Sequence, residues 1–238
     1  MRHELLGWLR RETVGLAFPP ICPVCRMAAA AAAGVCDHCR AQLPYIPGPA
    51  CRRCGGRLDT PQAECRDCAD NPRRWERAAS AFVFAGLARD CVHRFKYHGD
   101  VALVRFLAGA AWAAWQRGQP DGRAELIVPV PLHWCRALLR GYNQAELIAA
   151  ELGRHSGWPL IPALCRRRWT PPQSRLSRAG RRENLRRAFA VTRPAAVHGR
   201  AVLLVDDVMT TGTTLDECTR RLLAAGAAAV HVLTVARR

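Results

Sequence analysis

The chain contains 238 residues, of which 50% are apolar, so it is long enough for one large domain or two small ones around a buried core. Lysine and arginine number 36 against 19 acidic residues, a formal net charge of +17, and Lys96 is the only lysine. This composition excludes wholesale disorder. No apolar run reaches the roughly 18 residues that a membrane-spanning helix needs.

Residues 1–20 are predicted to form a helix whose charges are scattered along its length. They lack the continuous apolar stretch and the small-residue cleavage site of a secretory signal. We therefore expect a soluble, cytoplasmic protein. Disulfides are not expected in that reducing compartment, so the 12 cysteines of the chain require another explanation.

Eight of the cysteines form two copies of one motif, C-x2-C-x10-C-x2-C, and the second copy lies 29 residues after the first. Two C-x-x-C knuckles supply the four thiolates of a tetrahedral zinc site, and four cysteine ligands leave no open position for catalysis. We therefore predict a double zinc ribbon over residues 21–72 with two structural ions, each replacing a core that the segment is too small to build. The predicted ligands are Cys22, Cys25, Cys36, Cys39, Cys51, Cys54, Cys65 and Cys68.

Two alternatives remain for these cysteines. A single C-x-x-C pair is also compatible with redox chemistry, but four pairs in a regular repeat favour zinc. Pairing in sequence order within each copy is the simplest arrangement, and a cross-braced arrangement has the same signature. Cys91, Cys135, Cys165 and Cys218 lie outside the repeat and are interpreted as small apolar core residues.

An α/β domain is predicted over residues 73–238, after a linker at 70–74. The periodicity predicts a strand over 78–85 and helices over 88–97 and 101–117, and then strands alternate with helices. This alternation is typical of a doubly wound parallel sheet. The further predicted strands are 126–130, 189–191, 201–205 and 229–235, and the further helices are 144–155 and 213–225.

The most specific segment is VLLVDDVMTTGTTL, from Val202 to Leu215. It combines a buried strand, the acidic pair Asp206 and Asp207, a loop rich in threonine and glycine, and the start of a helix. Ligands of open α/β sheets bind at the carboxyl ends of strands, and a helix N-terminus favours anions. The loop therefore predicts a phosphate site, and the carboxylates suit either sugar hydroxyls or Mg²⁺.

This segment resembles the phosphoribosyl pyrophosphate (PRPP) motif of type I phosphoribosyltransferases. Three more segments narrow the resemblance to the ComF/GntX family of competence-associated proteins: RFKYHG from Arg94, VPVPLHWCRALLRGYNQAELIA from Val128, and QSRLSRAGRRENLRRAF from Gln173. With the cysteine pairs, they cover nearly the whole chain in order. The resemblance implies a type I phosphoribosyltransferase-like parallel sheet flanked by helices, preceded by a small cysteine-rich zinc-ribbon module.

The resemblance also implies roles for individual residues. Asp206 and Asp207 would be the catalytic pair that binds the ribose hydroxyls, and the loop would bind the 5′-phosphate through Thr210, Thr211, Gly212, Thr213 and Thr214. Arg136 and Arg140 are candidates for the pyrophosphate, since guanidinium groups bind phosphate oxygens bidentately; the alternative is a pair of solvated charges. Lys96 belongs either near the pyrophosphate or at the surface with its charge in solvent.

An arginine-rich segment, residues 166–187, corresponds to the loop that covers the family's active site. Its candidate anion ligands are Arg175, Arg178, Arg181 and Arg182. The function implied is Mg²⁺-dependent PRPP binding with transfer to an unidentified acceptor. The alternative is a non-catalytic factor that handles single-stranded DNA in natural transformation, with DNA-uptake or recombination proteins as partners. That alternative is favoured by the charge, the ribbons and the tryptophans among arginines, Trp75, Trp134, Trp158 and Trp169.

Overall fold

The computed structural model describes residues 21–27, 34–60, 63–117, 124–132, 138, 140–167 and 188–238. The chain forms two compact units, residues 1–43 and 44–238. The predicted helix over 1–20, Arg136 and most of the arginine-rich segment lie outside the described residues. Within the ranges given above, no helix has the length and apolar character needed to cross a membrane.

The first unit contains the first copy of the cysteine motif. Its helix α2 (Asp37–Gln42) begins directly after Cys36, which is the N-cap residue. The second copy has the equivalent helix α3 (Arg66–Asp70), which begins directly after Cys65. The sequence did not predict either helix, since five or six residues are too few to establish a helical period.

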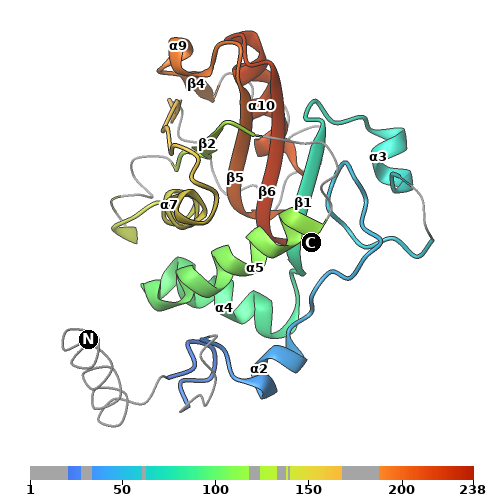
Figure 1. Cartoon of the computed structure of the whole chain (residues 1–238), viewed down its shortest axis with the longest axis vertical. Helices are drawn as coiled ribbons and strands as arrows, with labels where there is room; N and C mark the ends of the chain where they lie inside the picture. The colour runs from blue at the N-terminus through green and yellow to red at the C-terminus, as the bar shows by residue number, and fades with distance from the viewer. Residues whose placement is uncertain are drawn as a thin grey trace, which may run out of the picture. The chain divides into compact units, whose positions relative to one another are not determined.

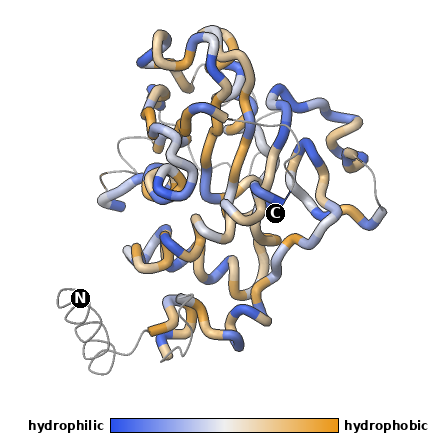
Figure 2. The backbone as a smooth tube through the Cα atoms, viewed as in Figure 1, coloured by the Kyte–Doolittle hydropathy of each residue, from blue (hydrophilic) through white to orange (hydrophobic). Residues whose placement is uncertain are grey.

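A four-stranded parallel sheet organises the second unit (Figure 1). Its order is β1 (Arg77–Val83), β6 (Ala229–Arg237), β5 (Ala201–Met209) and β2 (Leu126–Pro129). All three pairings are parallel, as the alternation of strands and helices predicted. The two central strands are mostly hydrophobic because both of their faces are covered, and Figure 2 shows them largely in orange.

Strand β5 is four residues longer than the sequence predicted, so Asp206 and Asp207 lie inside the strand rather than after it. The extension pairs with β6 as far as Met209 and Arg237, and these backbone bonds hold the carboxylates in extended geometry. The polar pair interrupts the apolar run, which is why hydropathy alone ended the strand at Val205.

Helices cover both faces of the sheet. Val202 and Leu204 of β5 join a buried core with residues of α10 (Thr213–Ala224) on one face. Alternate residues such as Leu203 and Val205 are equally buried and point to the other face. There α5 (Val104–Arg117) contacts β1 and β6, and α7 (Gln144–Ser156) contacts β2 and β5.

The remaining elements are short or lie at the border of the sheet. Helix α4 (Gly86–Tyr97) follows β1, and the 3-10 turn η1 (Val101–Leu103) leads into α5. Strands β3 (Leu164–Arg166) and β4 (Phe189–Val191) form an antiparallel pair, and α9 (Pro194–Val197) is a single turn. The sequence missed β3 and α9 because three or four residues carry no periodic signal.

Candidate functional site

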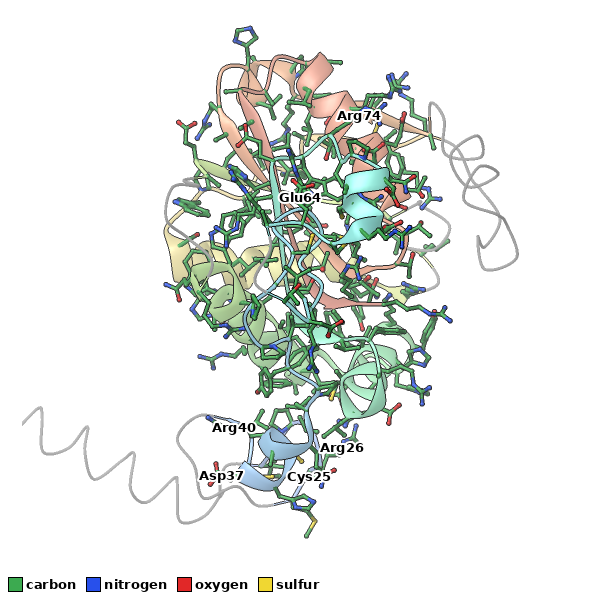
Figure 3. All side chains as sticks on the ribbon, turned by 90° about the vertical axis from the view of Figure 1, so that its right-hand side faces the viewer. Cys25, Arg26, Asp37, Arg40, Glu64 and Arg74 are labelled. Atoms are coloured by element: carbon green, nitrogen blue, oxygen red, sulfur yellow. The ribbon has the colours of Figure 1, made fainter. Side chains whose placement is uncertain are left out.

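Each copy of the cysteine motif brings its four thiols together. The Sγ atoms of Cys22, Cys25, Cys36 and Cys39 lie within 4.8 Å of one another, and so do those of Cys51, Cys54, Cys65 and Cys68. The grouping follows sequence order within each copy, so the cross-braced alternative does not describe this chain. Figure 3 shows Cys25 and Arg26 beside α2 at the first group.

The spacing of the sulfur atoms suits zinc. The Cys25 and Cys36 Sγ atoms are 3.7 Å apart, and so are the equivalent Cys54 and Cys65 atoms. A tetrahedron with Zn–S bonds of about 2.3 Å places its sulfurs roughly 3.8 Å apart. Both groups therefore fit a structural zinc ion with four thiolate ligands.

Backbone amides favour the thiolate form at one ligand of each group. The Cys36 N–H points to the Cys22 Sγ at 3.5 Å, and the Cys65 N–H points to the Cys51 Sγ at 3.3 Å. Burial raises the pKa of Cys22, but hydrogen bonds from backbone amides outweigh it and lower the pKa to about 6. The Cys54 side chain and backbone amides lower the pKa of Cys51 to about 4, against burial. These ligands are thus prepared to bind a cation near neutral pH.

The acidic pair of β5 lies at the carboxyl edge of the sheet beside the end of β2. Pro129 is the partner of Val205 in the register, and the Val130 N–H donates to the Val205 carbonyl at 2.8 Å. The segment that begins at Val130 therefore emerges next to Asp206 and Asp207. This is the edge at which open α/β sheets bind ligands.

Lys96 joins this site from helix α4. Its Nζ atom lies 2.9 Å from Asp207 Oδ2, and the two side chains are 18% and 12% exposed. The interpretation of Lys96 as a surface residue is therefore wrong, because its ammonium group is paired and largely withdrawn from solvent. Burial lowers the pKa of Lys96, but Asp207 and Asp206 outweigh it and raise the pKa overall, so the group carries a positive charge.

Asp206 precedes Asp207 in β5 and is half-buried. Its Oδ1 accepts a hydrogen bond from the Asp207 backbone N–H at 2.8 Å. Burial and the neighbouring Asp207 charge raise its pKa to about 7, against the opposing effects of Lys96, that N–H and Arg166. A buried carboxyl that titrates near neutral pH is a marker of a functional site.

The threonine-rich loop lies directly after β5. Gly212 takes a left-handed backbone (φ +76°) as the N-cap of α10, and no side chain caps that helix end within the described residues. The hydroxyls of Thr211 and Thr213 are 2.8 Å apart. Since the first amides of a helix have no partner inside it, they are available to an anion together with these hydroxyls.

Arg140 packs against the end of α4, next to Lys96. Its guanidinium stacks over the Tyr97 ring at 4.9 Å from the centroid and donates to Gln144 Oε1 at 3.1 Å. The nearby Tyr142 hydroxyl donates to the Phe95 carbonyl. Asn143 is the N-cap of α7, and its side chain accepts a hydrogen bond from the Ala145 N–H. Arg140 thus packs beside the helix that carries Lys96.

Sequence reasoning missed Arg73 and assigned residues 70–74 to a linker. The Arg73 side chain is 6% exposed and donates to the Thr211 carbonyl at 3.0 Å and to Asp67 at 2.9 Å. Arg74 forms an ion pair with Asp216 in the first turn of α10. The segment around Asn71-Pro72 has the composition of a linker and carries no motif, so only tertiary contacts reveal this role.

Comparison with known proteins finds two family models that match separate parts of the chain. A double zinc ribbon domain model matches residues 13–69, and a phosphoribosyl transferase domain model matches residues 170–238. Competence protein F of Haemophilus influenzae is 32% identical over 210 residues, which cover 86% of this chain and 90% of that protein. The chain belongs to the ComF/GntX family.

Other ComF-family relatives agree with this assignment. The DNA utilization protein YhgH of Escherichia coli is 32% identical over 228 residues, covering 93% of this chain and 99% of that protein. Among solved structures, that of the allosteric regulatory enzyme of purine biosynthesis covers 55% of this chain and 25% of that chain, at 24% identity and a TM-score of 0.38. A score this low carries no weight here, so the fold assignment rests on the sheet topology and the two domain models.

Proposed function

We propose that this ComF-family chain binds PRPP with Mg²⁺ at the carboxyl edge of its sheet. The observation that carries the proposal is the convergence of the Lys96–Asp207 ion pair, the half-buried Asp206 and the uncapped threonine loop at that edge. A cation, two acids and an anion-binding loop match a ligand that combines sugar hydroxyls with phosphate groups at both ends.

Each part of the ligand has candidate partners. The loop from Thr210 to Thr214 would bind the 5′-phosphate through backbone amides and hydroxyls. The acidic pair would accept hydrogen bonds from the ribose hydroxyls. Arg140 would bind the pyrophosphate from the segment after β2, together with Arg136, and Lys96 would hold the Asp207 carboxylate in place beside the sugar through their ion pair.

Magnesium fits the donor set at this edge. Mg²⁺ prefers carboxylate and phosphate oxygens, and Asp206 is the better protein ligand because Asp207 already has a cationic partner in Lys96. When bound with PRPP, Mg²⁺ supplies neutralisation of the pyrophosphate charge.

We propose transfer as the reaction of this site. The bond from ribose C1 to the pyrophosphate oxygen breaks, pyrophosphate leaves with both electrons of that bond, and a nitrogen of the acceptor bonds to C1 and then loses a proton. The carbon passes through an oxocarbenium-like state. Positioning of PRPP and positive charge around the leaving group supply the catalysis, so no nucleophile on the protein is required.

Calorimetric titration with PRPP and Mg²⁺ tests the binding. The double variant Asp206→Asn with Asp207→Asn is expected to lose detectable binding while the chain keeps its melting temperature within a few degrees. Asp90→Asn, an exposed carboxylate on α4, is the matched control and is expected to bind as the unaltered chain does. Equal PRPP affinity in the double variant would refute the proposal. Pyrophosphate release with a panel of bases and amines then tests transfer.

We also propose weak binding of single-stranded DNA. The net charge of +17 supports it, and two relatives carry names that refer to competence and to DNA utilization. Charge rather than stacking would supply the affinity, because Trp75 is fully buried and Trp158 packs edge-on against Trp112. Trp134 and Trp169 lie outside the described residues.

Salt dependence tests this second proposal. Fluorescence anisotropy with a labelled single-stranded oligonucleotide is expected to show affinity that falls steeply as salt rises, by a logarithmic slope of about −0.7 for each phosphate neutralised. Absence of binding at low salt, or a flat dependence on salt, would contradict it.

A further inference from the structure

We propose that Arg73 is a positioning residue that couples the second cysteine group to the phosphate loop. The second zinc ion, and not the first, would then control the affinity of the loop for a phosphate. The inference rests on the proposed PRPP site, and it assigns that site a dependence on a metal centre that does not touch the ligand.

The guanidinium of Arg73 links two segments that are far apart in the sequence. Its Nη2 donates to Asp67 Oδ2 at 2.9 Å, and its Nη1 donates to the Thr211 carbonyl at 3.0 Å, across 138 positions of the chain. The side chain is 6% exposed, so solvent screens these bonds little. Bonds of this kind, with a charged donor, are roughly twice as strong as neutral ones.

The bond to Thr211 sets the direction of a loop amide. The Thr211 carbonyl and the Gly212 N–H belong to one planar trans peptide, in which they point in opposite directions. By holding the carbonyl on its own side, Arg73 turns the Gly212 N–H to the opposite side of the loop. Gly212 is the N-cap of α10, so this amide is one of those that the proposed phosphate would use.

The Trp75 ring packs against the same peptide at Gly212. A Cβ atom on Gly212 would lie 3.0 Å from the Trp75 ring, so glycine is required for this close approach. The Trp75 Nε1–H donates to the Arg53 carbonyl at 2.5 Å, and Arg53 Nη1 donates back to the Trp75 carbonyl at 2.7 Å. Since Arg53 lies between Cys51 and Cys54, the indole is fixed to a zinc knuckle.

Arg74 completes the link from the same segment. Its side chain forms an ion pair with Asp216, and its N–H points to Asp216 Oδ1 at 3.4 Å. Asp216 also closes the first turn of α10 through its own N–H, which donates to the Gly212 carbonyl at 2.8 Å. Figure 3 labels Arg74 and Glu64 on the face that carries α3.

Zinc determines where Asp67 lies. Helix α3 has five residues, begins at the ligand Cys65 and contains the ligand Cys68. A helix this short is not stable alone, so its position depends on the metal that its cysteines bind. Without the ion, Asp67 and the knuckle around Arg53 lose their support, and Arg73 loses the acidic partner that helps to hold it against Thr211.

The first copy lacks the residues for this role. At the positions equivalent to Asp67 and Arg73 it has His38 and Pro44. The His38 Nε2 atom pairs instead with Gln42 Nε2 at 2.7 Å within α2. Only the second copy therefore has the acid and the arginine that reach the loop.

Calorimetry with ribose 5-phosphate and with inorganic pyrophosphate tests the coupling on the purified full-length protein. Arg73→Ala removes both hydrogen bonds of the guanidinium and is expected to weaken ribose 5-phosphate binding about tenfold, and Asp67→Asn, which removes the charge of one acceptor, is expected to weaken it by a smaller factor. Pyrophosphate binding, which does not use the loop, is expected to stay within twofold. Arg73→Lys, which can reach one partner at a time, is expected to fall between Arg73→Ala and the unaltered chain.

Zinc content separates the two copies. Cys68→Ser is expected to lower the zinc content by one ion and to weaken ribose 5-phosphate binding, whereas Cys39→Ser loses one ion and leaves binding unchanged. If Arg73→Ala does not fold, Asp67→Asn decides, since Asp67 is 42% exposed. Unchanged affinity in Asp67→Asn and Cys68→Ser would overturn the coupling. Failure of the unaltered chain to bind either phosphate would instead refute the proposed function.

Discussion

The two copies of the cysteine motif have the same backbone and different surroundings. In each, the residue after the second cysteine takes a left-handed backbone, Arg26 at φ +63° and Gly55 at φ +65°. The N–H of that residue donates to the carbonyl of the first cysteine at 2.8 Å in both copies. The knuckle therefore dictates the backbone, and it tolerates arginine in the first copy despite the cost of that conformation.

The second copy is adapted to contact strand β1. A Cβ atom on Gly55 would lie 2.9 Å from backbone atoms of Ala79 and Ser80, so a side chain is excluded at this position. The Ala78 N–H also donates to the Arg52 carbonyl at 2.8 Å. The ligand spacing thus defines a zinc site in both copies, and in the second copy the residues between the ligands also fit it to strand β1.

Loss of one zinc ligand from each copy gives the largest expected contrast. Cys51→Ser is expected to lower the zinc content from two ions to one and to destabilise the second unit by several kcal/mol, because metal binding is part of its folding free energy. Cys22→Ser is expected to lose one ion without changing the unfolding transition of the second unit. Elemental analysis and thermal melting measure both effects. Equal losses of stability in the second unit would contradict the expectation that only the second zinc site stabilises it.

Gly55→Ala tests the contact of the second copy with β1 at a single backbone position. It is expected to destabilise the second unit by about 2 kcal/mol or more, because the methyl group meets the β1 backbone and the left-handed conformation disfavours alanine. Arg26→Ala is the matched control and is expected to change stability by less than about 0.5 kcal/mol, because both residues pay the same backbone cost. Denaturant unfolding checks both variants, and a small loss of stability in Gly55→Ala would mean that β1 can move away from the added methyl group.

Between pH 6 and 8, ligand binding at the sheet edge is expected to change with pH, whereas the zinc content of the cysteine groups is not. Asp206 has a pKa of about 7, raised by burial and Asp207, so it gains a proton as the pH falls through that value. The proposed binding of PRPP and Mg²⁺ requires the carboxylate, so affinity is expected to fall about tenfold for each pH unit below 7. Calorimetry from pH 6 to 8 measures this, with zinc content as the control, and an affinity that stays constant over this range would contradict it.

Lys96→Met is expected to have the smallest effect of these variants, a shift in the pH midpoint of PRPP binding. Lys96 lowers the pKa of Asp206, so its removal should move the midpoint of the pH profile upward from about 7, by less than about one unit. Arg89→Met, an exposed cation on the same helix, is the matched control. An unchanged midpoint in Lys96→Met would mean that the ion pair with Asp207 does not act on Asp206.

Most of the sheet could be predicted because its strands are apolar and its helices are periodic. The four parallel strands and helices α4, α5, α7 and α10 lie within a few residues of their predicted ranges, apart from the longer β5. Cys91 and Cys218 are fully buried, as expected of apolar core residues. Helices α2, α3 and α9 and strand β3 were missed because pairing partners and metal ligands, rather than local sequence, define such short elements.

The candidate site was predictable where its residues are adjacent in the sequence. The acidic pair and the threonine loop occupy consecutive positions, and the strand before them indicates their place in the fold. The partners of these residues come from distant elements, Lys96 from α4 and Arg73 from the segment before β1, and no local pattern connects them to Asp207 or Thr211.

By itself, the sequence determined the two cysteine groups, the parallel α/β fold and the acidic strand with its loop, because spacing and hydropathy are properties of neighbouring residues. The tertiary structure alone decided that Lys96 faces Asp207, that burial and the charge of Asp207 raise the pKa of Asp206, and that Arg73 joins the second cysteine group to the threonine-rich loop. Those features depend on packing between segments up to 138 positions apart, where side-chain geometry rather than local periodicity sets the contacts.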